Sequence, residues 1–132
     1  MKLTSKSEYA LLALIFLARS GNGTVPVQLI ASSQGIPPKF LEQILLILKR
    51  AKYVRSHRGQ AGGYALAKSA ELIHLAEIIR LFDGALAPTE SVSSYFYEST
   101  PIEKEQNLLA VFRDIRNYVS DKLENTTLAD VS

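Results

Sequence analysis

Residues 35–66 read GIPPKFLEQILLILKRAKYVRSHRGQAGGYAL, and this stretch decides the fold that the sequence predicts. Pro37 and Pro38 favour the start of a helix, because proline fits the first helical turn, where its missing N–H would be unpaired anyway. After the helix, residues 53–57 alternate in a strand-like way, glycines follow, and residues 64–66 return. This order predicts a helix and then a small two-stranded hairpin.

The helix predicted over residues 38–51 has two different faces. At about 100° per residue, the apolar side chains form one continuous face, made of Phe40, Leu41, Ile44, Leu45, Ile47 and Leu48. The other face carries Lys39, Glu42, Gln43, Lys49 and Arg50, with Leu46 among them. Cations suit phosphate or guanine and glutamine suits adenine, so this polar face suits DNA. Since any surface helix carries charges, a merely solvated face is the alternative interpretation.

Two more helices are predicted before this stretch. The first runs over residues 5–20, with Ser5 and Glu8 at the spacing of a capping box. The second opens at Val25-Pro26 and ends at Gly35, which suits a left-handed cap. Two short helices joined by a tight, glycine-containing turn form a helix-turn-helix, so the second and third helices are predicted to form one.

Charge is distributed unevenly along the chain. Residues 1–68 carry a net charge of +8 and residues 69–132 a net charge of −6, within an overall charge of +2. A basic first half indicates an anionic partner for that half, the alternative being a chance distribution. Ser5 and Lys6 fit such a partner, because the free N–H groups at the start of a helix favour a phosphate. Plain capping of a solvated helix end is the other interpretation.

The tip of the predicted hairpin, residues 58–63, is rich in glycine. Three glycines in five residues let the backbone approach another surface closely. An arginine on a projecting tip can enter a narrow minor groove of DNA, where the electrostatic potential is most negative. The alternative is a solvated hairpin with ordinary turn glycines. Five cations fall within ten positions here: Lys49, Arg50, Lys52, Arg55 and Arg58.

The second half of the chain predicts two helices separated by a loop. A fourth helix is expected over residues 72–82, with Asp83-Gly84 as its end. Residues 85–99 follow as a loop. The aromatic residues 95–97 are expected to pack against this subunit or a partner, or to line a ligand pocket. His74 is expected to be a packed side chain rather than a ligand.

A long helix is predicted from Thr100 to about residue 124. Thr100, Pro101 and Glu103 have the pattern of a helix start. Apolar residues recur along this helix at intervals of four, three and four, and they expose too much surface for one small domain. We therefore predict a homodimer, although the helix can also fold back on its own domain. Residues 125–132 are expected to form a short turn or a frayed end, from which Leu128 and Val131 are able to dock on the domain. The predicted dimerisation residues are Leu108, Phe112, Ile115 and Val119.

Composition excludes several classes of protein. The chain of 132 residues has no cysteine and two histidines, so disulfides, thiol catalysis and cysteine-bound metals are ruled out. No GxSxG, HExxH or GKS/GKT sequence is present, and an enzyme is not expected. The longest apolar run, residues 9–18, is too short to span a bilayer, and no convincing cleavage site follows it. We expect one cytoplasmic domain with no cofactor and no membrane contact.

The segments LTSKSEYALLAL (residues 3–14) and IPPKFLEQILLILKRAKYVRSHRGQAGGYALAK (residues 36–68) resemble the Rrf-two family of winged-helix transcription regulators. The resemblance covers nearly the whole chain and is strongest in FLEQIL and in the RGxxGGYxLAK hairpin. It implies a bacterial, dimeric protein that binds a pseudo-palindromic DNA operator. It also implies a recognition helix in the major groove, and the hairpin, called the wing in this fold, in the minor groove.

The resemblance implies roles for particular residues. Glu42 and Gln43 match positions that face bases, Phe40 takes the place of a common tyrosine, and Arg58, Gly59 and Gln60 match the wing tip. Pro38 and Gln60 depart from the usual serine and proline, so the operator sequence is not implied.

A larger departure concerns iron. Cluster-binding members place three cysteines between Gly84 and Glu105, where this chain has none. Glu8 matches a carboxylate that some relatives use as a cluster ligand, but Leu12 stands where they have histidine. The resemblance therefore implies the cluster-free branch of the family, because the thiolates that hold a cluster are missing.

The sequence predicts a mainly α protein, a winged helix-turn-helix with a two-stranded wing and a long C-terminal dimerisation helix. Its regions are a DNA-binding region over residues 1–84, a loop over 85–99, and a dimerisation helix with its tail over 100–132, in one domain overall. We expect a homodimeric, sequence-specific DNA-binding repressor without an iron–sulfur cluster. Three alternatives stay open for its control: a small-molecule effector, a protein effector, or no effector. The alternative is a winged-helix protein-interaction module that does not bind DNA. The predicted DNA contacts are Ser5, Lys6, Gln28, Lys39, Phe40, Glu42, Gln43, Lys49, Arg50, Arg58, Gly59 and Gln60.

Overall fold

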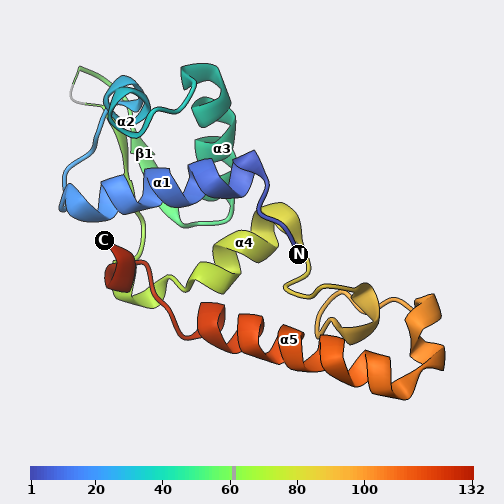
Figure 1. Ribbon diagram of the computed structural model, residues 1–132. Coiled ribbons are helices and arrows are strands. Elements are labelled where there is room, and N and C mark those ends of the chain that lie inside the picture. Colours follow the sequence, from blue (N-terminus) through green and yellow to red (C-terminus); the bar gives the residue numbers. More distant parts are fainter. Residues whose placement is uncertain (61) are drawn as a thin grey trace.

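The structure is a computed structural model, and it describes residues 1–60 and 62–132. Helix α1 crosses the middle of the molecule, with α2, α3 and the hairpin on one side and α4 and α5 on the other (Figure 1). The predicted fold class, a mainly α winged helix-turn-helix with a long C-terminal helix, is confirmed. The regular elements are α1 (Ser5–Arg19), α2 (Val27–Gln34), α3 (Pro38–Arg50), β1 (Val54–His57), β2 (Gly63–Leu66), α4 (Leu75–Asp83) and α5 (Gln106–Glu124).

The main hydrophobic core lies between α1 and α3. Ala10, Ala13, Leu14 and Leu17 of α1 are buried there against Leu41, Ile44, Leu45 and Leu48 of α3. These four residues of α3 belong to the face that the sequence predicts to be apolar. The face of α3 that points away from α1 is consequently fixed in space by the core.

The start of α1 differs from the prediction in its capping. Thr4, rather than Ser5, is the N-cap, and its hydroxyl oxygen accepts a hydrogen bond from the backbone N–H of Ser7 at 3.3 Å. The predicted capping box of Ser5 and Glu8 is therefore wrong, because Ser5 is already the first helical residue. The backbone N–H and the hydroxyl of Thr4 both donate to the carboxylate of Asp83 at the end of α4. This pair of bonds joins the start of α1 to α4.

Helix α4 begins three residues later than predicted. Ile73 and His74 are extended because they pair with the C-terminal tail: Leu128 N–H donates to the carbonyl of Ile73 at 2.7 Å, and Leu75 N–H donates to that of Thr126 at 2.9 Å. Residues 70–72 form a separate 3₁₀ turn. Leu128 is fully buried, so the tail is docked rather than frayed.

The long helix predicted from Thr100 is interrupted. Residues Pro101–Lys104 form a 3₁₀ helix, and α5 begins only at Gln106, although it ends at Glu124 as predicted. The hydroxyl of Thr100 donates to Ser91 at 2.8 Å instead of capping a helix. The carboxylate of Glu103 accepts hydrogen bonds from the Tyr97 hydroxyl at 2.7 Å and the Ser99 hydroxyl at 2.8 Å. The groups that would start the helix are thus bound to the preceding loop.

The predicted loop over residues 85–99 contains one short 3₁₀ helix, Glu90–Val92. Its small side chains face inward: Ala87 and Val92 are buried with Leu109 of α5, and Ser91 and Ser93 are buried too. Its aromatic residues Tyr95, Phe96 and Tyr97 are exposed. Within the part of the chain that the structure describes, no helix is long and apolar enough to cross a membrane.

Candidate nucleic-acid interface

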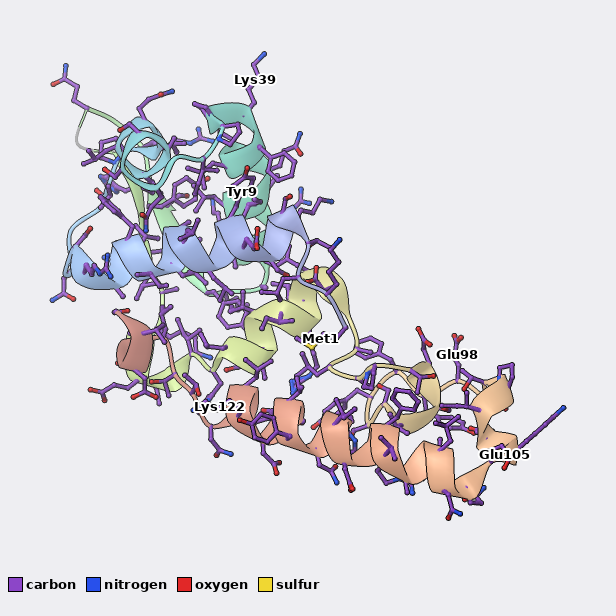
Figure 2. All side chains as sticks on the ribbon, viewed as in Figure 1. Met1, Tyr9, Lys39, Glu98, Glu105 and Lys122 are labelled. Atoms are coloured by element: carbon purple, nitrogen blue, oxygen red, sulfur yellow. The ribbon has the colours of Figure 1, made fainter. Side chains whose placement is uncertain are left out.

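The exposed face of α3 carries the predicted base-reading residues. Gly35 adopts the left-handed conformation, with φ of 67°, and ends α2 as predicted, so that Pro37 and Pro38 can begin the next helix. Because the core fixes the opposite face, polar side chains of α3 point to solvent, and Lys39 points away from the body of the molecule (Figure 2). The exposed residues are Lys39, Glu42, Gln43, Leu46, Lys49 and Arg50.

Phe40 occupies a different place from the other predicted contacts on α3. It is half-buried, and its ring meets that of Tyr9 edge-on, with ring centroids 5.5 Å apart. This contact joins the first turn of α3 to α1. Ser5 and Lys6, one turn before Tyr9, are both exposed, so the start of α1 offers a hydroxyl and a cation to solvent. Gln28, in the first turn of α2, is also exposed.

The wing is an antiparallel hairpin in which Val54 pairs with Leu66 and His57 with Gly63. Its tip closes through a hydrogen bond from Gly62 N–H to the carbonyl of Gly59 at 3.0 Å. Ala61, which the prediction includes in the tip, lies outside the described residues. The three predicted contact residues, Arg58, Gly59 and Gln60, are all exposed.

The wing is anchored to the segment before α2, a feature that the sequence analysis missed. Val25 and Tyr64 exchange two backbone hydrogen bonds, each 2.8 Å long. Gly63 has φ of 148°, and a Cβ atom there would lie only 2.0 Å from the carbonyl oxygen of Val25. Only glycine fits this close approach of two backbones. The wing is therefore held at a fixed position relative to the helix-turn-helix.

The cations of the first half have different partners. The guanidinium of Arg55 donates to the carbonyl of Asn22 at 3.0 Å, and the ammonium of Lys68 lies 5.3 Å from the ring centroid of Tyr53. Those two side chains are used within the fold. Lys49, Arg50 and Arg58 are exposed, and the one ion pair within the described residues joins Arg80 to Glu124, far along the chain. The cations of the α3 face and of the wing are thus exposed and form no ion pair within the described residues, so they are able to bind an anionic partner.

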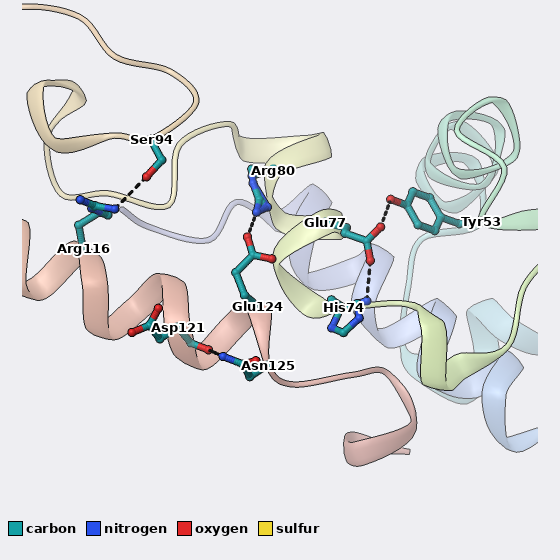
Figure 3. Close-up of polar contacts among 9 residues, drawn as sticks. All are labelled: Tyr53, His74, Glu77, Arg80, Ser94, Arg116, Asp121, Glu124 and Asn125. Atoms are coloured by element: carbon teal, nitrogen blue, oxygen red, sulfur yellow. Dashed lines mark hydrogen bonds and ion pairs between the residues drawn. The ribbon is translucent and has the colours of Figure 1, made fainter.

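Tyr53 connects the base of the wing to α4 (Figure 3). Its hydroxyl donates to one carboxylate oxygen of Glu77 at 3.1 Å, and the other oxygen accepts from the backbone N–H of His74 at 2.8 Å. Burial, together with the charge and hydrogen bond of Glu77, raises the pKa of Tyr53 to about 12. The tyrosine therefore stays protonated and keeps its hydrogen bond at neutral pH. His74 is a half-buried residue at the start of α4.

Helix α5 exposes an apolar stripe that differs in part from the predicted dimerisation set. Phe112 packs on the small core around Ala87, Val92 and Leu109, and Val119 is half-buried. Leu108 and Ile115 are exposed, as the prediction requires. The stripe, which recurs at intervals of three, four and three residues, consists of Leu108, Val111, Ile115 and Tyr118. This spacing is that of a coiled-coil seam.

Comparisons with known proteins agree on one family. The model of the Rrf2 family, described as an iron-dependent transcriptional regulator, matches residues 3–132. The HTH-type transcriptional regulator CymR of Bacillus subtilis is 32% identical to this chain, over 100% of the chain and 90% of CymR. The HTH-type transcriptional regulator IscR of Erwinia tasmaniensis is 34% identical, over 99% of this chain and 78% of IscR. The solved structure of B. subtilis CymR superposes with a TM-score of 0.80 at 30% identity, covering 99% of this chain and 95% of that one.

The residues present do not fit an iron–sulfur cluster. The sequence holds no cysteine, so no thiolate is available at any position. The two histidines are separated, His57 on β1 and His74 before α4. No group of three or more histidine, aspartate or glutamate side chains that could hold a metal occurs within residues 1–60 and 62–132. The donor chemistry of this chain thus departs from the description of the family as iron-dependent.

Proposed function

The chain belongs to the Rrf2 family of transcriptional regulators, and from this membership we propose that it is a homodimer that binds a pseudo-palindromic DNA operator. Members of the family are DNA-binding helix-turn-helix regulators and not enzymes. The observation that carries the proposal is the exposed polar face of α3, which contains one acid, Glu42, and stands beside an anchored wing with an exposed arginine.

The two halves of the interface have separate tasks. We propose that α3 enters the major groove, where Gln43 is able to pair with adenine and Glu42 with the amino group of cytosine. Arg58 at the wing tip enters the minor groove, and Lys39, Lys49 and Arg50 contact phosphates on either side. The free N–H groups at the start of α1, with Ser5 and Lys6, bind a further phosphate.

The exposed stripe of α5 supports the dimer. Two copies related by a two-fold axis would bury Leu108, Val111, Ile115 and Tyr118 against each other. In such a dimer the two-fold axis relates the two α3 helices and the two wings, so the two copies are inverted relative to each other along one bound duplex. An operator with two inverted half-sites matches that symmetry.

We also propose that the protein acts without an iron–sulfur cluster and that it represses transcription. A dimer that occupies an operator blocks the access of other proteins to that DNA. Control by an effector is supported by two contacts of α4, one from Asp83 to Thr4 at the start of α1 and one from Glu77 to Tyr53 at the base of the wing. A movement of α5 and of the loop over residues 85–99 would shift α4. The shift of α4 would be passed to Thr4 and Tyr53 through these two contacts, and it would alter the spacing of the two wings in the dimer.

Selection of bound sequences from a random pool of duplex DNA tests the proposed function. We expect an enriched inverted repeat whose two half-sites are about one helical turn apart, about 10 base pairs. Failure to enrich any sequence, with the protein folded and dimeric, would favour the second candidate, a protein-interaction module that has kept the fold. Enrichment of a single half-site would instead contradict the dimeric arrangement.

A further inference from the structure

A small pocket is lined by residues of α4, α5 and the loop over residues 85–99. These elements lie on the side of α1 away from α2 and α3 (Figure 1). The wall of the pocket contains two arginines from different helices, Arg80 of α4 and Arg116 of α5, together with Ser94 and Tyr95 of the loop. Figure 3 shows Arg80, Arg116 and Ser94. Two more hydroxyl groups, those of Ser93 and Ser120, complete the polar lining. This accumulation of hydrogen-bond donors lies outside the interface described above.

Arg116 has a positive charge that the fold does not neutralise. Its Nη1 donates to the hydroxyl oxygen of Ser94 at 2.8 Å. Its Nε is buried and has no hydrogen-bond acceptor within the described part of the chain, where no carboxylate lies within ion-pair distance of its guanidinium either. A buried N–H without an acceptor is unfavourable, and the penalty is larger for a charged group. Nε of Arg116 therefore lacks one hydrogen-bond acceptor, and the guanidinium charge favours an anionic one.

The neighbouring groups also favour an anion. The hydroxyl of Ser94 accepts from Arg116, and that of Ser93 accepts from the backbone N–H of Phe96 at 2.9 Å, so each can still donate its own proton. The carboxylate of Glu124, which would repel an anion, is paired with Arg80. The pocket thus presents donors and positive charge, which is the complement of an oxyanion.

We propose that this pocket binds the oxyanion group of a small molecule, with one oxygen accepting hydrogen bonds from Nε of Arg116 and from the hydroxyl of Ser94. The cavity measures about 10 Å³, room for about one water-sized atom. Tyr95 lies on the outer side: its ring is 4.8 Å from the guanidinium carbon of Arg80, and the residue is 74% exposed. The rest of the ligand would replace the Tyr95 ring over Arg80. Phosphoryl, sulfate and carboxylate groups share the required chemistry.

The site has a place in regulation only if the proposed function is correct. An oxyanion bound here would contact α4, α5 and the loop at once. Because Asp83 of α4 holds Thr4 and Glu77 holds Tyr53, the ligand would stiffen the helix that connects the dimer stripe to α1 and the wing. Binding of the anion itself does not require DNA, so the two proposals can fail independently.

Titration of the DNA-free protein with anions, followed through the arginine Nε–Hε signals in nitrogen–proton NMR spectra, tests the site. Sodium phosphate, sodium sulfate and sodium acetate are added separately, with sodium chloride adjusted to keep the ionic strength constant. We expect a saturable shift of the Arg116 signal with at least one of the three, and the anion that acts at the lowest concentration identifies the group. The Arg116 signal is assigned by its loss in Arg116→Lys, a variant that retains the charge.

Arg113, an exposed residue on the same helix that does not line the pocket, serves as the internal control. Its signal should shift weakly and without saturation. Ser94→Ala should weaken the binding of the anion by about 2- to 10-fold, because one hydrogen bond is lost. The proposal is overturned if no anion gives saturation at Arg116, if Arg113 responds in the same way, or if Ser94→Ala binds as tightly as the wild type.

Discussion

At the scale of single residues, the exposed cations and the exposed amide of the interface have different expected roles. Arg58 stands on a projecting tip, where a guanidinium reaches the backbone and the minor groove. Gln43 stands on the helix face that the core turns outward, where its amide can make paired hydrogen bonds with a base. Removal of the Arg58 side chain should weaken binding to all DNA sequences. Removal of the Gln43 side chain should change which DNA sequence is bound.

Arg58→Ala is expected to reduce affinity for every duplex by a similar factor. The slope of log affinity against log salt concentration should become shallower by about one, the value for one lost phosphate contact. Fluorescence anisotropy titrations at several salt concentrations measure the slope. Lys104→Ala, at an exposed cation outside the predicted interface, is the control and should leave the slope unchanged. If the slope in Arg58→Ala equals that of the wild type, the tip of the wing does not contact DNA.

Gln43→Ala is expected to relax base preference at one position of each half-site. The loss of discrimination should be about 1–3 kcal/mol at that position, with a smaller effect on binding to random duplex. Titration with a set of operators that carry all four base pairs at each position measures the preference. If preference were lost equally at every position, Gln43 would have a structural role rather than a reading role.

Tyr53→Phe is expected to lower the free energy of unfolding by about 1 kcal/mol at neutral pH, because the hydrogen bond to Glu77 is lost. The pKa of Tyr53 is raised in the folded state to about 12 from a usual value of 10, so the folded protein binds the proton more tightly than the unfolded chain. The stabilisation is therefore complete below pH 10 and is lost as the pH rises towards 12.

Urea unfolding of wild type and variant at pH 8 and at pH 11.5 measures this difference. The two free energies of unfolding should differ at the lower pH and converge at the higher one. Tyr118→Phe, at an exposed tyrosine on α5, should show neither effect. A difference between wild type and Tyr53→Phe that is the same at both pH values would contradict the raised pKa.

The sequence predicts residue positions well where a local pattern decides them. The period of α3 separates inward from outward residues, and the exposed polar set follows directly. The partners of Phe40 and Arg55 were not predictable in this way. Phe40 meets Tyr9, and Arg55 is bound to Asn22, 33 residues earlier in the chain, so both contacts depend on the tertiary packing.

At the scale of secondary-structure elements, the wing owes its position to Gly63. A Cβ atom added there would collide with the backbone of Val25, and the φ of 148° is unsuited to other residues. Gly63→Ala should destabilise the fold by about 1–3 kcal/mol and weaken DNA binding, since the wing moves away from α2. Gly23→Ala is the matched control, because nothing lies within 4 Å of a Cβ atom there. Thermal unfolding measures the stability of both variants, and anisotropy titration measures their affinity for DNA. Equal stability and equal affinity of Gly63→Ala and Gly23→Ala would show that Gly63 does not anchor the wing.

Two helix starts were predicted too early, and each has a physical reason. Local sequence favours a helix from residue 72 and from Thr100, but partners distant in the chain take the groups involved. Ile73 pairs with Leu128 of the tail, and Thr100 binds Ser91 of the loop. A local sequence pattern does not contain this competition, so it did not predict where the two helices start. The existence of both helices and their C-terminal ends do follow from the local pattern.

At the scale of the whole molecule, the apolar stripe on α5 is the surface that we propose a second copy covers. Ile115→Asp places a charge in its centre and should weaken the dimer at least about tenfold, with a further loss of operator affinity. Sedimentation velocity at several concentrations measures the association. Asn117→Asp introduces the same charge on the opposite side of α5 and should leave the dissociation constant of the dimer unchanged. A wild type that remains monomeric, or an Ile115→Asp protein that stays fully dimeric, would rule out this surface.

The uneven charge of the chain acquires a spatial meaning in the fold. The basic first half forms α1, α2, α3 and the wing, on which most of the exposed cations lie, and the acidic second half forms α4, the loop and α5. Sequence alone predicted this division and the family, since charge and motifs are local. The coupling between the halves through Asp83 and Glu77 was not predictable, because it joins residues that only folding brings together.

The central claim, that this protein reads DNA by sequence, is tested most directly by one titration. A duplex selected from the random pool and a scrambled duplex of the same composition are each titrated at about 50 and about 200 mM salt. We expect tighter binding to the selected duplex at both concentrations, and a loss of affinity for both duplexes as salt rises, because phosphate contacts release counterions. Equal affinity for the two duplexes, or binding that is absent at both salt concentrations, would contradict the claim.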